Sequence, residues 1–213
     1  TAGLRELLSQ LLRWRVGARW YVAALLPAPV LAAAVLFALS LTSPIFTAES
    51  KAAIPVAGIT AGLTTVLEEV GWTGFAVPRL RRRHGVVATG LIVGVVWGAW
   101  HLLQTLWVGG TYAGSLPVPV FVASYFFAGM AQLTAYRVLM VWVYDRTGSL
   151  LVATLMHGSL TASTLFVFTP AATGASFLIY TWALAGAMWI VVAAVALAGS
   201  EQLSRRPLQR RMA

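Results

Sequence analysis

The chain has 213 residues, of which 59% are hydrophobic and only 10% are charged. A soluble domain carries roughly 25% charged residues, so this composition excludes a water-soluble globular protein and predicts an integral membrane protein. The absence of cysteine excludes disulfides, thiolate catalysis, iron–sulfur clusters and zinc–thiolate sites. The net charge of +9 does not require a nucleic-acid partner, because Lys and Arg collect on the cytoplasmic side of membrane proteins.

Residues 1–19 are predicted to form an amphipathic helix that precedes the membrane spans. Leucines recur at the spacing of one helix face, and arginines accompany them. One interpretation is an interfacial helix that lies on anionic lipid headgroups. The other is a cap that packs on the cytoplasmic ends of the remaining helices. The leucines are Leu4, Leu7, Leu8, Leu11 and Leu12.

Residues 20–198 contain six apolar stretches, each long enough to cross a hydrocarbon layer of about 30 Å. Backbone groups must satisfy one another inside lipid, so these stretches are predicted to be helices. The expected fold class is an all-α polytopic membrane bundle of about six transmembrane helices, followed by a basic cytoplasmic tail at 199–213. The stretches are 20–41, 54–77, 86–108, 118–143, 149–169 and 176–198.

The basic residues indicate the orientation of this bundle. With six spans, Lys51 lies on one side and the other 14 of the 15 basic residues lie on or towards the opposite side. The positive-inside rule then places both termini in the cytoplasm. The loops on the other side, 42–53, 109–117 and 170–174, are too short for a folded extramembrane domain.

Four ionisable side chains lie at hydrocarbon depth, on three predicted spans. Glu68 and Glu69 are about 15 Å from the cytoplasmic end of the second span, His101 is about 22 Å into the third, and His157 is about 12 Å into the fifth. Burying a carboxylate at that depth costs several kcal/mol, and no basic residue on the same span is near, so a functional role is favoured over a structural one. A single membrane histidine, in contrast, is equally consistent with helix packing.

The spacing of these residues predicts how they divide their tasks. Adjacent helical residues point about 100° apart, so one of Glu68 and Glu69 is expected to face a site while the other supports it. His157 and Thr161 share a helix face, as do Trp97 and His101. A buried carboxylate suits a general base, and an imidazole can orient a water, donate to an oxyanion or bind a metal.

Three segments carry these residues: 68–75 reads EEVGWTGF, 97–101 reads WGAWH and 157–161 reads HGSLT. They resemble, in order and spacing, the EExxxR, FxxxH and HxxxN motifs of the CPBP family. That family comprises CAAX prenyl proteases of the Ras-converting type and bacteriocin-processing or immunity proteins. Residues 77–80 and 145–150 also resemble the family, so the resemblance covers roughly residues 55–165.

The resemblance implies a glutamate-dependent intramembrane endopeptidase. Carried over by position, Glu68 would activate the attacking water, His101 would stabilise the oxyanion, and His157 would orient the water or donate a proton. The family has been described both as metalloproteases and as proteases without an obligatory metal. Glu68, His101 and His157 could hold a divalent ion such as zinc with one open position, or only a water.

Three positions depart from the family motifs. Thr73 stands in place of the arginine that would pair with Glu69, which is then expected to be protonated or partnered by Arg137 or Thr73. Trp97 replaces a phenylalanine in an aromatic wall. Thr161 replaces an asparagine that would help to bind the oxyanion, and its hydroxyl still donates one hydrogen bond.

The leading hypothesis is a protease of the plasma membrane of a prokaryote that cleaves a peptide or protein substrate near the cytoplasmic leaflet. Thr73 and Thr161 motivate the alternative of a non-catalytic member, acting in bacteriocin immunity or interaction. A cofactor protein with His101 and His157 as bis-imidazole haem ligands and a proton-coupled transporter are further alternatives. The chain shows no internal repeat, which disfavours the transporter.

Overall fold

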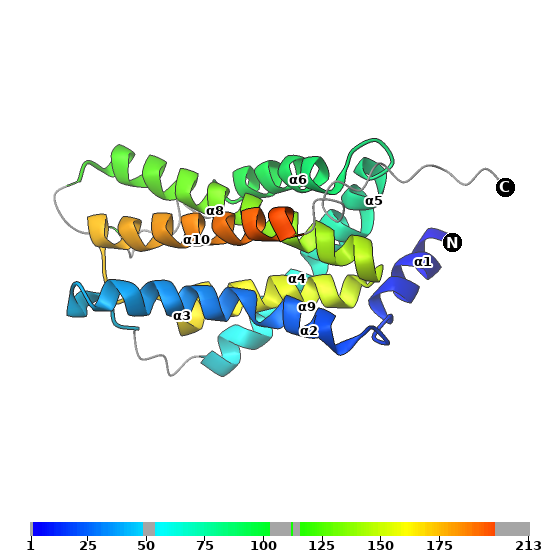
Figure 1. The fold of residues 1–213 in the computed structure, drawn as a ribbon, viewed down its shortest axis with the longest axis horizontal. Helices are drawn as coiled ribbons and strands as arrows, with labels where there is room; N and C mark the ends of the chain where they lie inside the picture. Colours follow the sequence, from blue (N-terminus) through cyan, green and yellow to red (C-terminus); the bar gives the residue numbers. More distant parts are fainter. Residues whose placement is uncertain (1, 49–53, 103–111, 113–115, 199–213) are drawn as a thin grey trace.

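The computed structural model describes residues 2–48, 54–102, 112 and 116–198, and in these ranges the chain is a bundle of helices (Figure 1). The predicted all-α fold class is confirmed, since the described residues contain no strand beyond an isolated bridge between Ala48 and Pro170. The helices are α1 (Ala2–Leu11), α2 (Ala18–Leu25), α3 (Pro27–Ser40), α4 (Ile54–Gly71), α5 (Val77–Leu80), α6 (Val86–Trp100), α8 (Val118–Thr147), α9 (Leu150–Ala162) and α10 (Gly174–Ala198).

Four segments of the described chain are long and apolar enough to cross a membrane. They are Ala18–Ser40, Val118–Thr147, Leu150–Val167 and Gly174–Ala198, which match the first, fourth, fifth and sixth predicted spans. The third prediction coincides with the shorter apolar helix Val86–Trp100, and its remaining residues 103–108 lie outside the described ranges, as does the predicted tail at 199–213.

The second predicted span is helical but not regular. A π-helical turn, Trp72–Ala76, joins α4 to α5, so the helical path runs on to Leu80 rather than ending at Val77. Such a bulge inserts an extra residue into the turn and shifts the side chains that follow it, and π-bulges are frequent at functional sites. This one begins three residues after Glu69 and contains Thr73.

The N-terminal helix is shorter than expected, because α1 ends at Leu11 and not near residue 19. The chain turns here because Arg13 offers its carbonyl to the Ser149 hydroxyl at 2.6 Å, and the Tyr21 hydroxyl donates to the Trp14 carbonyl at 2.6 Å. The Tyr144 hydroxyl also donates to the Gln10 side chain at 2.8 Å. α1 therefore caps the end of the bundle, while Leu4 and Leu8 stay exposed on it, as does Leu12 just after it.

The two ends of the bundle differ in charge. The end with α1, α5 and the turn between α8 and α9 carries Arg5, Arg13, Arg15, Arg79–Arg83 and Arg146, and we call it the arginine-rich end (Figure 1). The opposite end carries the 3₁₀ turn Pro44–Phe46 and the bridge from Ala48 to Pro170. One of these arginines also has a structural role: Arg81 is buried, pairs with Asp145 at 2.9 Å and thereby ties α5 to α8.

Glycines let α6 and α8 approach each other closely. Gly90, Gly94 and Gly98 repeat every fourth residue, and a Cβ atom at Gly94 would lie 2.7 Å from the Cα atom of Thr134. Gly90 and Gly98 meet the α8 backbone at Val138 and Met130 in the same way. Small residues at this spacing allow membrane helices to pack backbone against backbone. The glycine repeat thus places the end of α6 against the middle of α8.

Replacement of Gly94 by alanine is expected to lower the free energy of unfolding by about 1–3 kcal/mol, because the helices must separate to admit the methyl group. Gly186→Ala in α10 is the matched control, since a Cβ atom at Gly186 has no neighbour within 4 Å. Unfolding in detergent would be followed by circular dichroism. Equal stability of the two variants would contradict close packing at Gly94.

Candidate active site

Trp97 connects three helices at the centre of the site. Its side chain is fully buried, and its Nε1 donates a hydrogen bond to Glu68 Oε2 at 3.0 Å. Its ring meets the ring of His157 at a centroid distance of 4.8 Å and that of His101 at 5.5 Å, both edge to face. The tryptophan expected in an aromatic wall therefore brings together the reactive side chains of α4 and α9 and that of His101, which immediately follows α6.

Glu69 is held in a buried ion pair with Arg137. Two hydrogen bonds join the guanidinium to the carboxylate, from Nη1 to Oε2 at 2.8 Å and from Nη2 to Oε1 at 2.9 Å, and neither side chain is exposed. The Thr73 hydroxyl also donates to Glu69, and Arg137 lies over the Trp97 ring at 4.0 Å. Both partners expected for Glu69 are thus present, and they leave its charge balanced inside the bundle.

His157 is oriented by the same carboxylate. Its Nδ1 lies 2.9 Å from Glu69 Oε1, and because an ionised carboxylate only accepts, Nδ1 carries the proton. In the neutral imidazole Nε2 is then an acceptor. A carboxylate that holds a histidine tautomer in this way is the arrangement by which catalytic triads orient their base. Glu69 thus holds the His157 ring in one tautomer and one orientation.

His101 has the same tautomer for a different reason. Its Nδ1 is 2.8 Å from the Trp97 carbonyl, which can only accept, so Nδ1 must donate. Nε2 of a neutral His101 then accepts, and it donates only when the ring is an imidazolium. Stabilisation of an oxyanion by His101, as the sequence resemblance implies, consequently requires the charged ring.

The reactive side chains share one cavity of about 440 Å³. Glu68, His101, His157 and Thr161 all line it, whereas Glu69 does not. Of the two adjacent glutamates, Glu68 therefore faces the cavity and Glu69 does not, and their division of tasks stays a prediction. The four cavity-lining residues can bind a water and a polarised carbonyl group between them.

The least expected feature of the site is the role of Arg137. The sequence indicates only that Arg137 lies towards the arginine-rich end and that it is one of two possible partners of Glu69, yet it is fully buried at the centre of the network. A signal was present, because Arg137 is a lone charge within an apolar stretch of α8, and such a charge needs a partner in lipid. The repeat of Gly90, Gly94 and Gly98 is the signal that α8 is the neighbour of α6.

Within the described part of the chain, no three His, Asp or Glu side chains form a group that could hold a metal ion. Glu68, His101 and His157 line one cavity without meeting that condition. Zinc ligation by these residues stays a prediction, which metal analysis of the purified protein would test.

A comparison with known families finds a match over more than half of the chain. The family model for Rce1-like type II CAAX prenyl endopeptidases matches residues 47–163. The matched range contains every residue of the site, from Glu68 to Thr161. A search of curated proteins finds no match.

Proposed function

Since the chain belongs to the Rce1-like family of type II CAAX prenyl endopeptidases and carries membrane-spanning helices, we propose that it is an intramembrane endopeptidase in which Glu68 activates the attacking water. The observation that carries this proposal is that Glu68, His101 and His157, from three separate parts of the chain, line one cavity. Peptide hydrolysis needs a base, a proton donor for the leaving amine and a donor to the oxyanion. The cavity contains side chains for each task.

The first step is attack of water on the peptide carbonyl. Trp97 engages Oε2 of Glu68, so we assign Oε1 as the oxygen that takes the water proton. The new C–O bond forms as that proton moves to Glu68, and the carbonyl becomes an oxyanion. His157, fixed by Glu69, accepts the second hydrogen bond of the water through Nε2 and so orients it.

The second step is collapse of the tetrahedral intermediate. The C–N bond breaks, and Glu68 returns its proton to the nitrogen of the departing amine. The oxyanion needs donors until then, and the Thr161 hydroxyl and an imidazolium at His101 are the groups of the cavity wall that we assign to it. This gives Thr161 the task that the family motif assigns to asparagine.

Replacement of Thr161 by valine is expected to lower kcat by about 10²-fold, which is the effect of losing one oxyanion donor. Valine keeps the shape of threonine, so KM is expected to change little. Thr154→Val is the matched control, because Thr154 is on the same helix and bonds only to the Leu150 carbonyl. A Thr161→Val protein with unchanged kcat would remove Thr161 from the mechanism.

We further propose that the substrate is a peptide or protein segment, without requiring a prenyl group. The test is reconstitution of the purified protein in liposomes with membrane-embedded peptides, followed by mass spectrometry of the products. Protein carrying Glu68→Gln serves as the inactive control. Cleavage that occurs equally with both proteins would overturn the proposal.

A non-catalytic immunity or interaction role is the second candidate, favoured by Thr73 and Thr161 in the motifs. The structure weakens that argument at the first position, because Arg137 supplies a guanidinium to Glu69 in place of residue 73. Biological activity that survives Glu68→Gln combined with His101→Ala would support the non-catalytic role. We also propose that the protein lies in the plasma membrane of a prokaryote. The arginine distribution supports a cytoplasmic position of both termini.

A further inference from the structure

The N-terminal helix α1 is packed on one side only. It crosses the arginine-rich end obliquely to the long helices of the bundle (Figure 1), and Leu7, Gln10 and Leu11 on it are half-buried. A Cβ atom at Gly74 in the π-turn would lie 2.7 Å from Leu7 Cδ2, so Leu7 rests on that turn. The Tyr144 hydroxyl holds Gln10 by the hydrogen bond described above. These contacts fix α1 in place, so its exposed sides cannot turn towards the bundle.

A strip of exposed leucines lies beside the packed side of α1. Leu4 and Leu8 are 58% and 47% exposed, and Leu12, just after the helix, is 71% exposed. Successive helical residues turn by about 100°, so Leu4 and Leu8 share one side, while Arg5 and Ser9 lie on a polar side next to it. We call Leu4, Leu8 and Leu12 the leucine strip. Large apolar side chains that are exposed together mark a binding surface for a protein or a membrane.

The charges that accompany the leucine strip are mainly positive. Arg5 is exposed and directly follows the first leucine of the strip, and Arg15 and Arg19 are exposed between α1 and the first span. Glu6 is the only acidic residue among residues 1–19, and it lies about 160° around the helix from Leu8. Apolar side chains bordered by basic residues are typical of a helix that binds an anionic lipid surface. The charge therefore favours lipid headgroups as the occupant of the strip.

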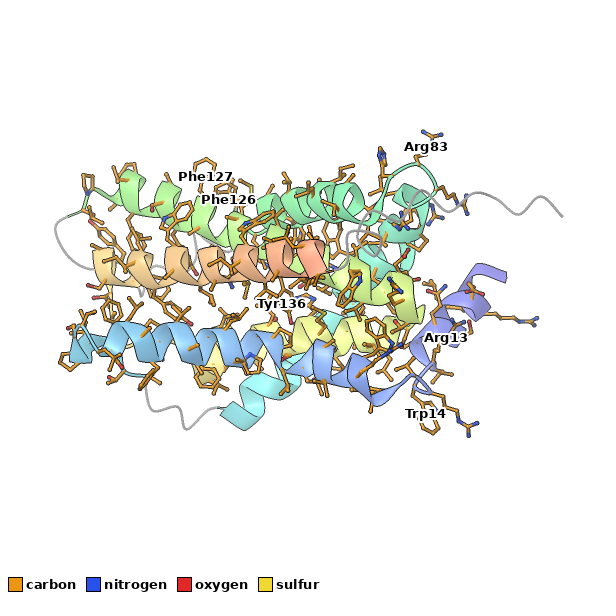
Figure 2. All side chains as sticks on the ribbon, in the orientation of Figure 1. Arg13, Trp14, Arg83, Phe126, Phe127 and Tyr136 are labelled. Carbon is orange, nitrogen blue, oxygen red and sulfur yellow. The ribbon has the colours of Figure 1, made fainter. Side chains whose placement is uncertain are left out.

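Two tryptophans place this region at the level of the headgroups. Trp14 is 59% exposed, with the Arg15 guanidinium 5.0 Å from its ring centroid, and the Arg19 guanidinium lies 5.3 Å from the ring of Trp20. Figure 2 shows Trp14 at the arginine-rich end with its ring pointing away from the bundle. Tryptophan is enriched where hydrocarbon meets headgroups. Since the first span begins at Ala18, the leucine strip lies next to this surface of the membrane.

We propose that the leucine strip of α1 inserts into the anionic lipid surface at the arginine-rich end of the bundle. The leucines enter the boundary of the acyl chains, while Arg5, Arg15 and Arg19 bind the lipid phosphates. A second copy of the chain is a poorer occupant, because it would bring the same positive charges together. The cap and the interfacial helix predicted for this segment are then two sides of one helix. The inference is independent of the proposed protease function.

Single cysteines in this cysteine-free chain test the insertion of α1. Leu8→Cys carries a fluorophore on the leucine strip, and Ser9→Cys, exposed on the polar side, carries the same fluorophore as the matched control. The full chain is reconstituted in liposomes of phosphatidylcholine with phosphatidylglycerol that contain lipids with a nitroxide on the acyl chain. The nitroxide is expected to quench the fluorophore of Leu8→Cys at least twice as strongly as that of Ser9→Cys.

Two further arms test the charge. Each arginine near an anionic surface strengthens binding by about fivefold, so quenching of Leu8→Cys is expected to fall at least twofold in liposomes of phosphatidylcholine alone. The same fall is expected in anionic liposomes when Arg5→Gln and Arg15→Gln are added to Leu8→Cys. Equal quenching at the two labelled positions would overturn the inference, and so would quenching that is unchanged by the lipid charge. Quenching of Leu8→Cys that falls as the protein-to-lipid ratio rises would assign the strip to a second copy of the chain instead.

Discussion

Glutamine in place of Glu68 is expected to reduce peptide hydrolysis by about 10²–10⁴-fold, the usual contribution of a positioned general base. The glutamine oxygen can still accept the hydrogen bond from Trp97 Nε1, so the contact that links α4 to α6 is retained. Glu68 also faces the cavity rather than the packed interior, so the bundle is expected to unfold at nearly the wild-type temperature. Loss of turnover without loss of stability is the signature of a residue that acts on the substrate.

Two other glutamates give this prediction its controls. Glu6→Gln on the exposed α1 helix is expected to leave hydrolysis unchanged, since Glu6 bonds only to nearby residues of its own helix. Glu69→Gln is expected to lower both stability and turnover, because it breaks the ion pair that orients His157. Turnover would be measured in liposomes with a fluorogenic peptide. Full activity of Glu68→Gln would eliminate the glutamate-activated mechanism.

Methionine in place of Arg137 is expected to destabilise the protein by about 3–5 kcal/mol, because it leaves the charge of Glu69 buried without its partner. Arg137 also covers the Trp97 ring, so its loss is expected to loosen the residue that holds Glu68. Unfolding in detergent would measure the effect. Arg82→Met, an exposed arginine near the arginine-rich end, is the matched control and is expected to change the stability by less than about 0.5 kcal/mol.

A double replacement separates the ion pair from the volume of the side chain. Arg137→Met combined with Glu69→Gln removes the unpaired charge, so part of the lost stability is expected to return. Arg137→Met combined with Thr73→Arg offers a guanidinium from α4 instead of α8, at the position where the family motif has arginine. We expect this second combination to recover hydrolysis as well as stability. Failure of both combinations to improve on Arg137→Met would show that the charge balance of Glu69 is not what Arg137 provides.

The guanidinium of Arg137 on α8 explains how the first motif can carry Thr73 in place of arginine. Thr73 is one turn after Glu69 and carries no charge that could neutralise it, yet its hydroxyl donates to the carboxylate and accepts from Arg137 at 3.3 Å. Because the charge comes from α8, the position of His157 depends on the contact between α6 and α8 as well as on α4. Gly94 maintains that contact, and a Cβ atom there would lie 3.2 Å from the Cβ atom of Arg137.

The all-α membrane bundle and the depth of the reactive residues could be predicted from the sequence alone. Hydrocarbon forces the backbone to pair within each span, and every residue advances the helix by about 1.5 Å, so depth follows from counting. The cost of burying ionisable groups in lipid then singles out Glu68, Glu69, His101 and His157 as functional candidates. The division of the two glutamates likewise follows from the angle between neighbouring helical residues.

Only the tertiary structure decided which side chains meet. Counting along a helix does not determine which neighbour it faces, because that depends on close packing such as the contact of Gly94 with Thr134. The pairing of Glu69 with Arg137, the central place of Trp97 and the lining of the cavity all depend on these contacts. The four ionisable groups in the membrane could thus be found from sequence and depth, whereas their partners came from the way the helices pack.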